Sequence, residues 1–427
     1  MRVLLLSCYE LGHPPLALAQ AAGALRAAGA EASVQDLAVE ELDEARVRAA
    51  EWVAISTPMH TALRLGAKVA ERVRGINPSV RVAFFGLYAG LNAELLHADA
   101  VIGAESEDGL VHLVRGEAMG NPRHPSRGAR RLPLAPRAHD VLPPLAKYAR
   151  AVIDGEERAA GYVEASSGCL HHCRHCPLPP AYDGRFYVNP VDEVMRDVEA
   201  QLARGARHVT FGDPDFLNGP KHAVAVARAM RGRGVTWDVT AKIEHLLKHA
   251  ALLPELAASG CVFVVSAVES LSNRVLEVLD KGHTRDDVFR ALELVRAAGL
   301  ALRPSFVMFT PWTTREDYLD VLGWIDREDL VDHVDAVQLT IRLLVPPGSL
   351  LERHDAMRPH LRELIPQAFA WKWTHPDPGM DRLYADVFRV VAKGAGFDEV
   401  CGIAGYARRA VPRARRKVPR LTEPWFC

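Results

Sequence analysis

Short apolar runs alternate with amphipathic stretches along the first 118 residues. Apolar residues fall at helical spacing in residues 16–25 and 63–73, between apolar runs short enough to be strands. The predicted strands are residues 3–6, 32–34, 53–55, 82–85 and 100–102. Strands that alternate with helices predict a parallel, doubly wound sheet, whose ligands gather at the carboxyl ends of the strands. No G-x-G-x-x-G follows the first strand, which disfavours a dinucleotide site.

A second alternation begins near residue 161 and predicts an incomplete barrel of six strand-helix units. The predicted strands are residues 162–165, 208–211, 236–239, 261–266, 305–309 and 334–339. Chemistry is expected at the carboxyl ends of such strands. We therefore divide the chain into an α/β domain (1–118), a linker rich in proline and arginine (119–158), a partial barrel (159–352) and a mixed C-terminal segment with a basic tail that ends in cysteine (353–427).

The composition is that of an ordinary globular protein. The 427 residues are 49% hydrophobic, and 52 Lys and Arg balance 53 Asp and Glu to a net charge of -1. The longest apolar runs are far shorter than a membrane span, and the N-terminal run ends too early for a secretory leader. We expect a cytoplasmic protein with no membrane contact. The basic run at residues 408–420 is interpreted as a solvated tail, so we expect no nucleic-acid partner.

Three of the seven cysteines carry the strongest chemical signal. Cys169, Cys173 and Cys176 have C-x3-C-x2-C spacing on the loop after the first barrel strand. Three thiolates suit a cubane iron-sulfur cluster and leave one iron open to another ligand. An odd cysteine count with such clustering fits metal chemistry in a reducing compartment better than disulfides.

Zinc is the alternative for this loop. A histidine of the same stretch would complete a zinc site, and the candidates are His171, His172 and His175. The chain would then be a zinc-bound structural or interaction protein rather than an enzyme.

The three-cysteine loop in a six-unit barrel resembles the radical S-adenosylmethionine (SAM) enzymes over residues 161–349. The resemblance implies that Cys169, Cys173 and Cys176 hold a [4Fe-4S] cluster and that SAM chelates the open iron. Reductive cleavage of SAM would then start radical chemistry on a small-molecule substrate. An external electron donor of the flavodoxin or ferredoxin type is implied as well. His175 departs from the aromatic residue common at its position.

Polar residues follow the later barrel strands, where the family contacts SAM. The cofactor-binding residues implied by the resemblance are Gly212, Asp213, Asp215, Lys242, Glu269, Gln338 and Arg342. Each has a structural interpretation as well: the two aspartates could flank a turn at Pro214, Glu269 could cap a helix, and the basic side chains could be solvated. Their positions at successive strand ends favour the site.

The N-terminal domain, Rossmann-like in its alternation, resembles the cobalamin-binding module fused to one branch of these enzymes. The similarity rests on Pro15-Leu16-Ala17-Leu18 and on Gly103-Ala104-Glu105. The Asp-x-His-x-x-Gly loop that supplies an axial histidine is absent, so cobalamin would bind without that ligand. A sheet that binds no corrin and only docks on the barrel is the alternative. The rim residues of interest are His13, Met59, His60 and Tyr88.

The tail resembles a radical SAM group that ends in Cys-Cys-Ala-Glu-Pro or Cys-selenocysteine-Ala-Glu-Pro after a Leu-Thr-Glu-Pro-Trp segment. This sequence stops at Cys427, so we hypothesise that a UGA codon was taken as a stop. Cys427 is the predicted catalytic thiol, alone or beside a selenol, because soft chalcogens exchange readily. A frayed terminus is the alternative.

Together these features predict a radical SAM enzyme that uses a [4Fe-4S] cluster and SAM on an unidentified small substrate, with participation of the tail thiol or selenol. A cobalamin-dependent radical SAM methyltransferase is the alternative function.

Overall fold

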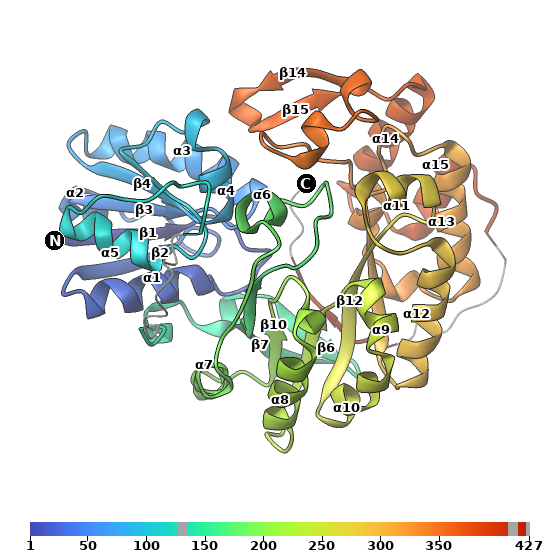
Figure 1. Cartoon of the computed structure of the whole chain (residues 1–427), viewed down its shortest axis with the longest axis horizontal. Coiled ribbons are helices and arrows are strands. Elements are labelled where there is room, and N and C mark those ends of the chain that lie inside the picture. Colours follow the sequence, from blue (N-terminus) through green and yellow to red (C-terminus); the bar gives the residue numbers. More distant parts are fainter. Residues whose placement is uncertain (126–134, 409–416, 424–427) are drawn as a thin grey trace.

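The computed structural model describes residues 1–125, 135–408 and 417–423. An N-terminal α/β domain stands beside a curled sheet covered by helices, and a C-terminal segment packs on the far side of that sheet (Figure 1). Among the described residues, no helix combines the length and apolar character that a membrane crossing requires.

The N-terminal sheet is parallel throughout, with strand order β2-β1-β3-β4-β5. Its strands are β1 (Arg2–Ser7), β2 (Glu31–Asp36), β3 (Trp52–Ser56), β4 (Arg81–Phe85) and β5 (Ala100–Ile102). All five predicted strands are confirmed. The order reverses beside β1, and this reversal is where doubly wound sheets bind ligands.

Helices cover both faces of this sheet, because successive strand residues point to opposite faces. One apolar cluster joins α1 and α5 to Val3 and Leu5, and the other joins α2 and α3 to Leu4 and Leu6. The helices are α1 (Leu16–Ala27), α2 (Glu44–Ala49), α3 (His60–Ile76), α4 (Leu87–Leu91) and α5 (Glu107–Arg115).

The barrel sheet has five parallel strands and two antiparallel strands at one edge, in the order β13-β12-β11-β10-β7-β6-β16. The strands are β6 (Arg150–Ile153), β7 (Glu156–Val163), β10 (His208–Phe211), β11 (Thr236–Thr240), β12 (Cys261–Glu269), β13 (Ala301–Phe306) and β16 (Arg420–Leu421). The sheet thus begins before the predicted barrel boundary at residue 159, and a strand from the tail completes its edge.

Helices line the outer face of this sheet, and a large apolar core that includes Phe211, Trp237 and Trp324 fills the layer between them. These helices are α7 (Val191–Ala203), α8 (Pro220–Met230), α9 (Ile243–Lys248), α10 (Leu253–Ala258), α12 (Arg285–Ala297) and α13 (Arg315–Arg327). Two other helices lie outside this layer: α6 (Leu178–Tyr182) packs on the N-terminal domain, and α11 (Asn273–Leu279) packs with the C-terminal segment. A separate hairpin, β8 (Ser166–Gly168) with β9 (Phe186–Val188), flanks the cysteine loop.

The predicted sixth strand is wrong. Residues Ala336–Thr340 form a short 3-10 helix, η7, and only an isolated bridge between Phe309 and Arg342 continues the sheet. The Gln338 side chain replaces a strand backbone here, because its Oε1 accepts from the Phe306 N–H at 3.1 Å. The sixth unit therefore follows β13 without adding a regular strand to the open sheet.

The C-terminal segment caps the open side of the barrel. It comprises the hairpin β14 (Leu361–Ile365) and β15 (Ala370–Trp373), and the helices α14 (Pro378–Val391) and α15 (Phe397–Ala404). The two helices join the barrel core through Val387 and Val400.

The N-terminal domain is tied to the rest of the chain by polar and apolar contacts. The Tyr148 hydroxyl donates to Asp36 at 2.9 Å, and the Tyr182 hydroxyl donates to Glu105 at 2.9 Å. On the other side, a His60 ring nitrogen lies 2.7 Å from the Ala368 carbonyl. These contacts hold the carboxyl ends of the two sheets toward one another.

Candidate functional site

The three predicted cluster cysteines gather on the loop after β8. Cys169 and Cys173 are buried and Cys176 is half-buried. Burial, followed by the charges of Cys173 and Cys169, raises the pKa of Cys176 to about 12. Gly168 starts the loop at a φ of 75°, and a Cβ there would lie 2.3 Å from the Arg185 carbonyl oxygen, so only glycine fits.

A buried ion pair faces these thiols. Lys281 is 3% exposed, and its ammonium lies 3.2 Å from Glu269 and close enough to Cys173 and Cys176 to interact with their charges. Burial raises the pKa of Glu269, but Lys281 and then His175 outweigh it and lower the pKa to about 2. Lys281 is thus a fixed cation that offsets the negative charge of a thiolate-bound cluster.

The residues around the loop fit an iron-sulfur cluster. Burial raises the pKa values of Cys169 and Cys176, and thiols become thiolates when a metal displaces their protons. Asn218 lies beside Cys169, with 3.9 Å between its Oδ1 and the Sγ, and its buried Nδ2 has no hydrogen-bond partner. That amide can donate a hydrogen bond to a thiolate or to a cluster sulfide. Such hydrogen bonds shift the reduction potential of iron-sulfur clusters.

Two predicted SAM residues lie at the end of β10 in tightly fixed positions. The Asp213 carboxylate accepts from the Ala165 N–H at 2.9 Å and from the Ser166 hydroxyl, and burial raises its pKa to about 6. A Cβ on Gly212 would lie 1.9 Å from the Tyr162 hydroxyl oxygen. Asp213 therefore shapes the start of the cysteine loop through the backbone.

Two further predicted residues, Asp215 and Lys242, follow β10 and β11. The Asp215 carboxylate accepts from the Leu217 N–H at 3.1 Å and lies 2.6 Å from a ring nitrogen of His245. The Lys242 ammonium lies 3.3 Å from Glu244 and is largely buried rather than solvated. The structure brings Asp215, Lys242 and Glu269 to the same end of the barrel as the cysteines.

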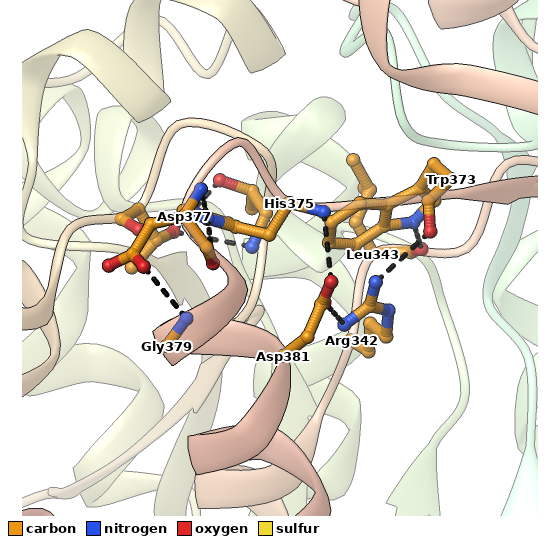
Figure 2. A network of polar contacts seen from close by, with 9 residues as sticks. Arg342, Leu343, Trp373, His375, Asp377, Gly379 and Asp381 are labelled. Carbon is orange, nitrogen blue, oxygen red and sulfur yellow. Dashed lines mark hydrogen bonds and ion pairs between the residues drawn. The ribbon is translucent and has the colours of Figure 1, made fainter.

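Arg342 lies in a separate network under the C-terminal segment. Its guanidinium donates to Asp381 at 2.8 Å and to the Trp373 carbonyl at 3.1 Å, and stacks 3.6 Å from the centre of the Trp373 ring (Figure 2). His375 joins through its backbone N–H, which donates to Asp381. Gln338, by contrast, lines the cavity inside the barrel.

A chamber of about 280 Å³ lies where the two sheets face each other. From the N-terminal domain, Ser56, Gly86 and Glu105 line it at the carboxyl ends of β3, β4 and β5. From the barrel, Gly168 and Gly212 line it beside the cysteine loop. Residues from both strand-end regions therefore line one common space.

A second cavity of about 310 Å³ adjoins this chamber and extends into the barrel. Glu164 lines both spaces, and burial, partly offset by Arg137, raises its pKa to about 8. Glu10 also lines the second cavity, and its buried Oε1 has no hydrogen-bond partner. His13 contacts Glu423 of the tail at 2.9 Å at this cavity, so the described end of the chain reaches it.

The described lining of the chamber would leave a bound corrin without a histidine ligand from the protein. No histidine lines the chamber among the residues that the structure describes. Of the predicted rim residues, Met59 lines both spaces and His13 only the second cavity, while His60 and Tyr88 pack toward the C-terminal segment. No histidine of this lining would therefore coordinate the cobalt.

Several site residues escaped sequence reasoning. Lys281 lies in the turn after α11, Asn218 in a short 3-10 helix after β10, and His245 in the first turn of α9. No sequence motif connects these three positions. Cys427, the predicted catalytic thiol, lies outside the described residues, as do residues 424–426.

Comparisons with known proteins agree with this geometry. Residues 163–325 match the family model of the radical SAM superfamily, and residues 2–114 match the B12 binding domain. An uncharacterized methyltransferase of Pyrococcus horikoshii is 24% identical over 312 residues, which cover 66% of this chain and 65% of that protein. A tRNA-2-methylthio-N(6)-dimethylallyladenosine synthase of a Sulfurihydrogenibium species is 24% identical over 49% of this chain and 50% of its own length.

Solved structures share the two-domain fold. The radical SAM methyltransferase TsrM of Kitasatospora setae, with tryptophan and a SAM analogue bound, has a TM-score of 0.61 at 18% identity and covers 77% of this chain and 71% of its own. The cobalamin-dependent enzyme OxsB, with aqua-cobalamin and SAM bound, has a TM-score of 0.69 at 13% identity and covers 92% of this chain and 67% of its own. The predicted fold class is confirmed, and the family matches favour iron over zinc on the three cysteines.

Proposed function

Because the chain joins a B12-binding domain to a radical SAM domain, we propose that it is a cobalamin-dependent radical SAM methyltransferase acting on a small molecule. One observation carries the proposal: the carboxyl ends of both parallel sheets line a single chamber beside the three cysteines. The comparisons support a methyltransferase better than they support radical chemistry with participation of a tail thiol.

The chain's own residues would bind, orient and shield the reactants. Cys169, Cys173 and Cys176 would hold a [4Fe-4S] cluster with SAM, and the chamber would hold cobalamin. When bound, these groups supply a reductively cleavable sulfonium and a methyl carrier. The substrate would enter the adjoining cavity, whose buried Glu10 and Glu164 carboxyls could each hold a proton.

The remaining predicted residues have supporting roles in this proposal. Lys281 and Glu269 balance charge beside the cysteines, Gly212 keeps the passage between chamber and cavity open, and Gln338 lines the cavity. An external electron donor is needed, and we keep the flavodoxin or ferredoxin type and the cytoplasmic location as parts of the proposal, since a reducing compartment preserves the thiols.

The test is anaerobic reconstitution with iron, sulfide and cobalamin, followed by reductant and SAM with a deuterated methyl group. We expect one cobalamin per chain and release of S-adenosylhomocysteine. Protein that binds no corrin and releases only 5′-deoxyadenosine or methylthioadenosine would contradict methyl transfer. The variant Ala104→Phe, which fills the chamber, should lose cobalamin and keep its iron. The matched change on an exposed helix of the same domain, Ala49→Phe, should keep both.

A further inference from the structure

Two histidines and an aspartate meet beside the cysteine loop. His171 lies within the loop itself, Asp215 follows β10, and His245 lies in the first turn of α9. One potential ligand atom from each residue lies within 4.8 Å of those of the other two. Three separate elements therefore bring imidazole and carboxylate groups to one point.

The ring nitrogens of the two histidines face each other. The Nε2 atoms of His171 and His245 are 3.1 Å apart, a separation typical of two ligands on one metal ion as well as of a ring-to-ring hydrogen bond. The other ring nitrogen of each histidine faces a carboxylate: Asp215 at 2.6 Å from His245, and Glu244 at 3.5 Å from His171. Glu244, which is not one of the three candidate ligands, is placed to orient the His171 imidazole.

The burial of the group leaves polar capacity unused. Asp215 is fully buried and His245 is 5% exposed. Although Asp215 Oδ2 and His245 Nδ1 are 2.6 Å apart, neither atom meets hydrogen-bond geometry with any described group. The two atoms form a close ion pair, and a metal ion could replace the proton between them.

The local charge also favours a cation. Asp215 and Glu244 contribute two negative charges, and Lys242, 3.3 Å from Glu244, contributes one positive charge. The set is therefore negative by one charge while both imidazoles are neutral. His171 is the most exposed of the three candidate ligands, with 19% of its side chain accessible, so an ion can enter beside it.

We propose that His171, His245 and Asp215 bind one divalent transition-metal ion, Fe²⁺ or Zn²⁺, at a site separate from the three-cysteine cluster. Two imidazoles and one carboxylate are a donor set that suits both ions and leaves coordination positions for water. The ion would join the cysteine loop to the ends of β10 and β11. Because the His171 backbone N–H also donates to Cys169, the ion would fix the loop next to the cluster.

Metal analysis of the reconstituted holoenzyme tests this site independently of the proposed function. The protein, with its [4Fe-4S] cluster in place, is dialysed anaerobically against micromolar Zn²⁺ or Fe²⁺ and then against metal-free buffer. Zinc, iron and acid-labile sulfide are measured for wild type, His171→Gln, His245→Gln and the control His172→Gln, a neighbouring histidine outside the group. Diffraction at the zinc absorption edge locates the ion.

We expect one ion per chain beyond the cluster in wild type and His172→Gln, and at least tenfold weaker binding in the other two variants. Extra iron without extra sulfide would identify Fe²⁺, and extra zinc would identify Zn²⁺. Wild type without an extra ion, equal metal in all four proteins, or zinc located on the cysteines would each overturn the proposal. His171→Gln lies on a partly exposed loop, so it decides the question if His245→Gln fails to fold.

Discussion

Two polar networks support the barrel, and they differ in how completely their hydrogen-bonding groups are satisfied. Around Arg342, the guanidinium, the Asp381 carboxylate and the Trp373 indole all have partners (Figure 2). Around the cysteine loop, buried atoms of His175, Asn218, Asp215, His245 and His283 have no hydrogen-bond partner among the described residues.

The difference separates a structural network from a functional one. A closed network fastens the C-terminal segment to the barrel and has no capacity left for a ligand. The network at the cysteine loop keeps donors and acceptors that only a bound group can satisfy, and native proteins rarely leave such atoms unpaired without a reason.

Removal of a cluster ligand should have the largest effect. Cys169→Ala leaves two thiolates, which cannot hold the cluster in place, so we expect loss of most iron and at least a hundredfold slower SAM cleavage. Iron analysis, electron paramagnetic resonance of the reduced protein and product assays measure these effects. Cys401→Ala, a buried thiol in α15, is the control and should retain the cluster. Normal iron in Cys169→Ala would exclude the cysteine site.

Replacement of Lys281 should change the acid sensitivity of the metal-free protein. The pKa of Glu269 is lowered from 4.5 to about 2, so its ion pair stabilises the fold fully above about pH 4.5 and loses this stabilisation as the pH falls toward 2. The full loss is roughly 3 kcal/mol. In Lys281→Met the loss should be smaller, because the buried carboxyl no longer prefers its charged form.

Urea unfolding between pH 6 and pH 2.5 measures this difference. The control Lys248→Met removes an exposed lysine from α9 and should follow wild type at every pH. An unchanged pH dependence in Lys281→Met would show that the pair does not hold Glu269 ionised.

Disruption of the closed network should destabilise the fold without affecting the metal. Arg342→Ala removes a partly buried ion pair and the stack on Trp373, which should lower the free energy of unfolding by about 2 kcal/mol. Arg342→Lys should recover only part of the lost free energy of unfolding, because lysine has no planar group that can donate both hydrogen bonds. Cluster iron should equal that of wild type, and loss of iron would show that the two networks are coupled.

The smallest effect is expected at the tail contact. Glu423→Gln removes the charge that faces His13, which should weaken the contact by less than about 1 kcal/mol. Hydrogen exchange at the Thr422 amide, which donates to the Arg150 carbonyl at 2.9 Å, should become a few-fold faster by mass spectrometry, while exchange in β10 stays unchanged. Faster exchange throughout the barrel would mean that the tail contact supports the whole fold.

Local patterns predicted much of the fold. The five N-terminal strands and the first four barrel strands follow from apolar runs bounded by turns, and the cysteine spacing lies within one loop. The fifth barrel strand was predicted at residues 305–309 and lies earlier, at Ala301–Phe306. The sixth strand failed because a tertiary contact overrides its alternation: the Gln338 side chain takes the Phe306 N–H that a strand would take.

The rest of the site depends on contacts between distant segments. Asp215 was predicted as a SAM ligand from its strand end, but its approach to His245 and to the cysteine loop is set by packing of three elements. Arg342 was expected in the barrel from alternation with Gln338, and the lost strand regularity turns it toward Asp381 instead. Sequence alone carries no signal for either partner.

The pairing of β16 with β6 has a consequence for synthesis of the protein. Leu421 pairs with Ala151, so the exposed side of β6 stays open while nearly all later residues emerge from the ribosome. Unpaired strand edges attract other chains. Truncation before residue 420 should therefore give a protein prone to aggregation as it is made, even though the core of its barrel would be intact.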